Sequence, residues 1–153
     1  MVQYAGIPAK LAYENLEMRR FIAAHALDQF RMNPSFPVST LLLLRGADAA
    51  DAAGVPGAFV GAALAAMCEN NHDMSNRAVF VAVFNAAGFG GRRLLARTQE
   101  QSIKDALAVN TQAPVATRTF GIPTFLIGGE IFFCRGPVGT GRSGTGLTAT
   151  VDL

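Results

Sequence analysis

Two cysteines and two histidines are the side chains that could form a metal or redox centre. Cys68 and Cys134 lie far apart and form no CxxC pair, so these residues encode neither a zinc ribbon nor a dithiol redox centre. His25 and His72 are equally isolated, with no second histidine or cysteine at metal-ligand spacing. We therefore interpret the cysteines as small buried hydrophobes and each histidine as a surface or capping residue.

A glycine pattern near the carboxyl end matches a dinucleotide-binding motif in its spacing alone. Gly139, Gly141 and Gly144 fit GxGxxG, but no convincing strand precedes them and no helical pattern follows. A phosphate-binding loop of this kind works because it joins a strand to the N-terminus of a helix. We instead interpret residues 134–153 as a glycine-rich, disordered tail.

Two proline-containing segments could present the backbone to a ligand. Residues 31–38 carry two prolines whose preceding residues are pushed out of the α region, so this segment must be an extended loop. An X–Pro bond can adopt the cis form at a cost of roughly 0.5–1 kcal/mol. A cis Ile122–Pro123 bond would turn the N–H and C=O of Ile122 outward, where they could pair as an edge strand accepts a peptide. The alternative is that Pro123 only begins a strand.

Composition favours a single globular domain around these segments. Of the 153 residues 50% are hydrophobic and 16% are charged, which is enough apolar surface for a core. The longest apolar runs, residues 57–67 and 79–84, are far shorter than the roughly 20 residues of a spanning helix. A net charge of +2 with scattered arginines argues against nucleic acid. Residues 2–8 do not form a signal peptide, so we expect a cytoplasmic protein without a membrane partner.

The first two predicted helices flank the proline loop. An amphipathic pattern opens at Pro8 and runs to about Leu27. After the loop, Ser39 or Thr40 can cap a second helix, which Gly54 closes.

Further helical patterns continue to about residue 119. One helix begins at Pro56 and stops at the polar residues 69–73, and the next is capped by Ser75 and ended by Gly88. Helical material follows from residue 91, with Pro114 as an expected kink or break. About five helical segments are expected in all.

The pattern changes to a hairpin at the end of this helical region. Residues 121–127 are a short β-type run, Gly128 and Gly129 form a two-residue turn, and residues 130–133 return. An isolated hairpin is marginal in water, so it needs further strands, and the sequence supplies no convincing ones.

Two of these stretches together resemble a known family. Residues 31–41 resemble the asparagine–proline loop of the 2-hydroxychromene-2-carboxylate isomerases and the related kappa-class glutathione transferases. Residues 119–125, followed by Gly129-Glu130 and Phe132-Phe133, resemble their cis-proline strand and hairpin. Residues 7–10 resemble the family's lysine segment, so the resemblance covers residues 6–133.

The resemblance implies a DsbA-like thioredoxin superfamily member of α+β class. We expect an incomplete thioredoxin-like fold in residues 1–133, with an all-helical insertion at about residues 39–112 and a C-terminal β-hairpin. Members of the family isomerise unsaturated aromatic acids with glutathione as cofactor. The glutathione thiolate adds to a conjugated carbon, and a serine hydroxyl keeps the sulfur ionised.

The resemblance also implies binding roles. Lys10 would hold a carboxylate of glutathione or substrate; the alternative is a solvated lysine at a helix start. Asn33 and Pro34 would line the cleft for glutathione and substrate; the alternative is a turn that closes two helices. The backbone of Ile122, exposed by Pro123, would pair with the γ-glutamyl-cysteine part of glutathione. Family members are commonly dimers, but the sequence leaves the oligomeric state open.

The chain departs from the family pattern at both ends. Only nine residues precede Lys10, so the family's first strand and its Ser-Pro turn are expected to be missing, and with them the catalytic serine. After Phe133 the chain reads Cys134-Arg135-Gly136 in place of the family's ending, which a single-nucleotide frameshift would explain. We therefore expect the isolated chain to be inactive or poorly active.

Two other interpretations stay open. One is a fragment of a DsbA-like thiol–disulfide oxidoreductase, whose CxxC would lie in the missing part. The other is a non-catalytic helical remnant that dimerises through its apolar faces.

Overall fold

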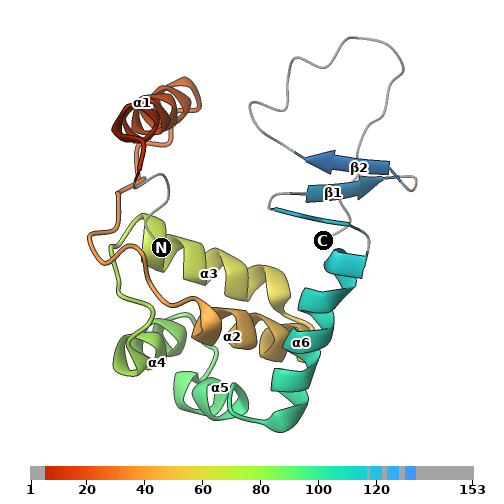
Figure 1. Ribbon diagram of the computed structural model, residues 1–153. Helices are drawn as coiled ribbons and strands as arrows, with labels where there is room; N and C mark the ends of the chain where they lie inside the picture. The colour runs from red at the N-terminus through yellow and green to blue at the C-terminus, as the bar shows by residue number, and fades with distance from the viewer. Residues whose placement is uncertain (1–5, 117, 122–123, 128–129, 134–153) are drawn as a thin grey trace. The chain divides into compact units, whose positions relative to one another are not determined.

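Six helices precede two strands among the residues that the computed structural model describes, which are 6–116, 118–121, 124–127 and 130–133 (Figure 1). The helices are α1 (Pro8–Ala24), α2 (Leu41–Asp51), α3 (Pro56–Cys68), α4 (Arg77–Ala86), α5 (Gly91–Arg97) and α6 (Gln101–Ala116). The strands are β1 (Thr124–Ile127) and β2 (Glu130–Phe133). The chain divides into two compact units, Met1–Lys104 and Asp105–Leu153.

Four helices of the first unit enclose a phenylalanine core. Helix α2 packs against α3 and α5, and α4 packs against the same two helices (Figure 1). Phe59, Phe80 and Phe84 are fully buried, and the rings of Phe59 and Phe84 stack nearly parallel with centroids 4.4 Å apart. The buried cluster also contains Met74, Leu94, Ile103 and three alanines, Ala49, Ala50 and Ala66. Because aromatic side chains bury large apolar areas, these rings supply much of the hydrophobic stabilisation of the unit.

Two glycines allow this packing to be close. A Cβ on Gly46 of α2 would lie 2.6 Å from the Phe59 ring, and one on Gly91 of α5 would lie 2.3 Å from the backbone oxygen of Val81. The Asn85 side chain fixes the same approach, since its Oδ1 accepts a hydrogen bond from the Gly91 N–H at 2.7 Å. The contact between α4 and α5 therefore depends on the absence of a side chain at position 91.

Most predicted helix ends are confirmed. Pro8 and Pro56 stand at the starts of α1 and α3, where a missing N–H costs nothing. Gly54 and Gly88 follow α2 and α4 with φ of +74° and +83°, a conformation that glycine adopts without strain.

One predicted cap is wrong. The N-cap of α4 is Asn76, whose Oδ1 accepts from the N–H groups of Ala78 and Val79 at 2.9 and 3.4 Å. Ser75 instead donates its hydroxyl to Asp73, one turn outside the helix. Both residue types cap helices well, and only the backbone path decides between neighbours.

The last helical region also differs from expectation. It forms two helices, separated at residues 98–100, where buried Thr98 donates its hydroxyl to the Leu95 carbonyl at 2.7 Å. Helix α6 continues past Pro114 to Ala116, so the proline does not break the helix there. Proline disrupts a helix interior, but this one stands in the last turn.

The second unit contains the predicted hairpin. Strands β1 and β2 pair antiparallel, with Thr124 opposite Phe133 and Ile127 opposite Glu130. The Phe120 ring packs against the Phe133 ring with centroids 4.9 Å apart and the planes tilted by 47°, while Phe125 and Phe132 are exposed. Gly128 and the predicted tail at residues 134–153 lie outside the described residues.

Substitution of Gly91 by alanine should destabilise the first unit. The new methyl group would meet backbone, which cannot move aside as a side chain can. We expect Gly91→Ala to lower the free energy of unfolding by about 1–3 kcal/mol in urea titrations. Gly61→Ala in α3 is the matched control, because nothing lies within 4 Å of its Cβ. That change should raise stability by about 0.5–1 kcal/mol, and equal effects of the two variants would contradict the packing described.

Candidate functional site

The side chain of Asn33 is buried and fully engaged within the protein. Its exposed fraction is 8%. The amide nitrogen donates two hydrogen bonds, to the carbonyl of Met67 at 3.0 Å and to that of His72 at 2.9 Å. An asparagine amide has only two N–H donors, so both are used.

The acceptor end of the same side chain shapes the loop. Asn33 Oδ1 accepts from the backbone N–H of Ser35 at 2.9 Å, and the Asn33 carbonyl accepts from that of Phe36 at 3.1 Å. Such an asparagine turn replaces a backbone turn and leaves its central residue outside. Pro34 and Ser35 are accordingly exposed. The loop therefore presents Pro34 to solvent while Asn33 holds it in place.

The loop also satisfies the end of α3. Met67 and Cys68 are the last residues of α3, where backbone carbonyls lack partners within the helix. The Asn33 amide serves the Met67 carbonyl, and the Arg31 N–H donates to the Cys68 carbonyl. The Arg31 guanidinium donates hydrogen bonds to the carbonyls of Asp28 and Phe30, which hold this residue in place. The asparagine–proline loop is thus a C-terminal cap of α3 built from distant residues.

The other predicted binding residues lie elsewhere. Lys10 occupies the first turn of α1 and is partly buried, although α1 contributes no fully buried residue. Ile122 and Pro123 lie outside the described residues. Asn33 and Pro34 are consecutive residues of one loop, and the binding roles of Lys10, Asn33, Pro34, Ile122 and Pro123 all stay predictions.

Two contacts are described for the residues on either side of Ile122 and Pro123. The Thr124 hydroxyl donates a hydrogen bond to the Gly121 carbonyl. A Cβ on Gly121 would lie 2.9 Å from the Phe133 ring, so a side chain there would meet β2.

The histidines and cysteines of the described residues do not gather into a cluster. Among them no group of three or more histidine, cysteine or acidic side chains could hold a metal ion. His25 caps α1, with its Nδ1 at 2.9 Å from the Phe21 carbonyl, and His72 contributes its carbonyl to Asn33. Within the same residues, no helix is both long and apolar enough to span a membrane. Cys68 is partly buried, and Cys134 is not described.

Removal of the Asn33 side chain should cost measurable stability. Asn33→Ala takes away the shared partner of two carbonyls and of the Ser35 N–H. We expect a loss of about 1–3 kcal/mol in the free energy of unfolding, because buried polar groups would lose their hydrogen bonds. Asn70→Ala is the control, since its amide also donates to a carbonyl but is exposed. It should change stability by no more than about 0.5 kcal/mol, and an equally small loss at Asn33 would show that its side chain anchors nothing.

Comparison with known proteins identifies the family of the chain. The family model described as the DSBA-like thioredoxin domain matches residues 2–140. No curated protein matches the chain significantly. The family match includes the asparagine–proline loop, the helices α2–α6 and the hairpin. The chain therefore belongs to the DSBA-like thioredoxin domain family.

Proposed function

We propose that the chain is part of a glutathione-dependent isomerase that acts on aromatic acids like 2-hydroxychromene-2-carboxylate. Membership of the DSBA-like family supports the coarser part of this proposal, a thioredoxin-type domain. The finer part is supported by the resemblance of two segments, the asparagine–proline loop and the hairpin that follows residue 119. The first segment contains an asparagine turn, and the second contains a two-stranded antiparallel hairpin.

The observation that carries the proposal is the anchored loop around Asn33. The Asn33 amide uses both of its N–H donors on distant carbonyls, which holds the loop against the end of α3. Here the anchor fixes an exposed Pro34 and Ser35 in one conformation. Rigid loops with exposed small or polar residues are the usual places for ligand contacts. In our proposal Asn33 is a positioning residue and the ligand meets the loop at Pro34.

For this reaction the protein has to position glutathione and the substrate and to supply a charge that holds a carboxylate. The glutathione thiolate adds to the conjugated carbon, the former double bond becomes a single bond and rotates, and elimination of the thiolate restores the double bond. Atoms and electrons balance without a redox partner. A positive charge at Lys10 would hold a carboxylate of glutathione or substrate by a charge-assisted hydrogen bond.

The hydroxyl that keeps the sulfur ionised has no candidate among the described serines. Ser35 and Ser39 lie in the loop before α2, Ser75 precedes α4, and Ser102 lies in the first turn of α6. None of them stands between a strand and a helix. We therefore expect residues 1–153 by themselves to bind glutathione weakly and to turn over slowly.

A thiol–disulfide oxidoreductase is the second candidate, because the DSBA-like family description fits it equally well. That reaction needs two cysteines that can form and break one disulfide. Cys68 and Cys134 do not form a CxxC pair, so a redox centre would have to come from residues outside this sequence.

Glutathione binding by the chain tests the isomerase proposal. Calorimetric titration should show weak, saturable binding, and Lys10→Gln should weaken it about two- to fivefold, the value of one exposed ion pair. Arg19→Gln removes a charge from exposed Arg19 on the same helix and should leave the affinity unchanged. Absorbance assays with 2-hydroxychromene-2-carboxylate should give slow turnover only when glutathione is present.

Two results would refute the proposal. One is the absence of any glutathione binding at millimolar concentration. The other is a glutathione affinity that Lys10→Gln lowers no more than Arg19→Gln does.

A further inference from the structure

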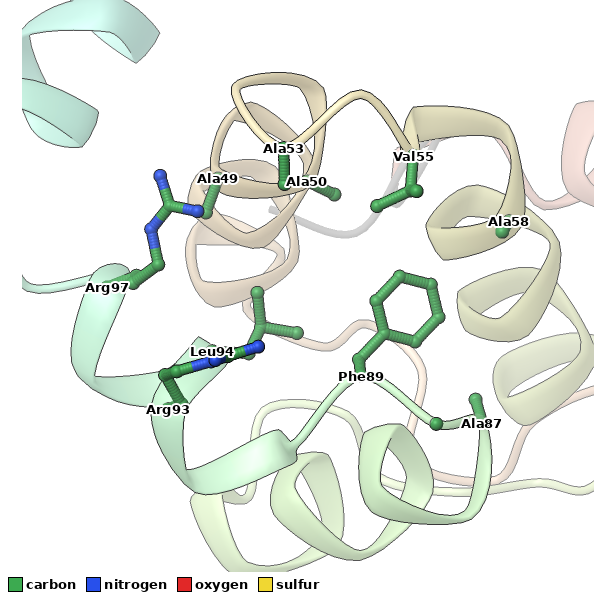
Figure 2. Close-up of a pocket in the computed structure, with 11 residues that line it drawn as sticks. Ala49, Ala50, Ala53, Val55, Ala58, Ala87, Phe89, Arg93, Leu94 and Arg97 are labelled. Carbon is green, nitrogen blue, oxygen red and sulfur yellow. The ribbon is translucent and has the colours of Figure 1, made fainter.

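A half-open cavity lies within the first unit, apart from the asparagine–proline loop. Its volume is about 340 Å³, and it is bordered by the end of α2, the start of α3, the turn after α4 and one face of α5 (Figure 2). The walls are alanine side chains together with Val55, Phe89 and Leu94. The space exists because these alanines are short where longer side chains would meet.

The aromatic wall of this cavity has a fixed orientation. Phe89 packs edge-on against the core rings of Phe59 and Phe84, with centroids 6.0 and 5.7 Å away and interplanar angles near 90°. Figure 2 shows its ring projecting between Val55 and Leu94. A ring held by the core can serve as a contact surface without loss of side-chain entropy on binding.

Two arginines provide the charge of the cavity. Arg93 and Arg97 are four residues apart on α5 and so share one face of this helix, and both belong to the lining (Figure 2). No lining residue is acidic. Among the residues that the structure describes, neither guanidinium has a hydrogen-bond or ion-pair partner.

Helix stability does not account for this arrangement. Like charges four residues apart repel each other, and Arg93 stands in the first turn of α5, where the helix dipole disfavours a cation. Only Arg97, in the last turn, is favoured by the dipole. An anion between the two guanidinium groups would remove the repulsion.

We propose that this cavity binds a small apolar monocarboxylate, such as a short arylalkanoic acid. The carboxylate would take paired hydrogen bonds from Arg93 and Arg97, since guanidinium groups match carboxylates in geometry. The apolar part would lie on the alanines and on the Phe89 ring. The volume is at the lower end of the range for ligand pockets, which favours a small acid over a peptide or a nucleotide. This site is independent of glutathione and of the isomerase proposal.

Titration of the full chain with 4-phenylbutyrate tests the assignment. We expect saturable binding by calorimetry, at least tenfold tighter than binding of the neutral 4-phenylbutyramide. Arg93→Gln and Arg97→Gln should each weaken binding fivefold or more. Arg92→Gln is the charge-matched control, because Arg92 neighbours Arg93 on α5 but is not part of the lining.

A second pair of variants tests the apolar part without touching charge. Ala53 is exposed and lines the cavity, so Ala53→Leu should fill it and abolish binding while the chain stays folded. Ala52→Leu places the same side chain outside the lining and should bind normally. The proposal is overturned if the amide binds as well as the acid, if Arg92→Gln weakens binding as much as Arg93→Gln, or if Ala53→Leu retains full affinity.

Discussion

The structure depends on hydrogen bonds to the backbone carbonyls at the C-terminal end of α3. The last carbonyls of α3 have no partners within the helix, and burying such groups unpaired is costly. Asn33 donates one amide proton to the Met67 carbonyl at the end of α3 and the other to the His72 carbonyl in the loop that follows, from a position more than thirty residues earlier in the chain. One side chain thereby joins the loop after α1 to the helical body and sets the shape of the loop.

The helical body that receives this loop is rigid for reasons of packing. Stacked phenylalanine rings fill its centre, and Gly46 and Gly91 let neighbouring helices approach to distances that no Cβ would permit. Interiors packed in this way transmit small changes rather than absorb them. Both the anchored loop and the alanine-lined cavity are built on this body, one at the end of α3 and the other against α5.

Local patterns in the sequence predict much of this fold, and the reasons for success and failure are physical. Prolines and glycines mark the ends of α1 to α4 because their backbone limits act locally, and the hairpin was predicted from two short β-type runs around a glycine pair. The break between α5 and α6 was missed because residues 98–100 contain neither proline nor glycine. The role of Asn33 could not be derived, since its partners are backbone carbonyls far along the chain that carry no residue-specific signal. The cavity likewise needs four segments brought together, and only tertiary structure shows which alanines face one another.

The chain belongs to the DSBA-like family, and our proposal of a glutathione-dependent function depends on the anchored loop around Asn33. The most direct measurement is hydrogen exchange at the side-chain amide of Asn33, followed by NMR with the exposed Asn70 amide as the internal reference. A clamped Asn33 should exchange at least a hundredfold more slowly than Asn70, and added glutathione should shift the backbone amide of Ser35 while the Asn33 protons stay protected. Equal exchange at the two amides would contradict the anchored loop on which the proposed function depends.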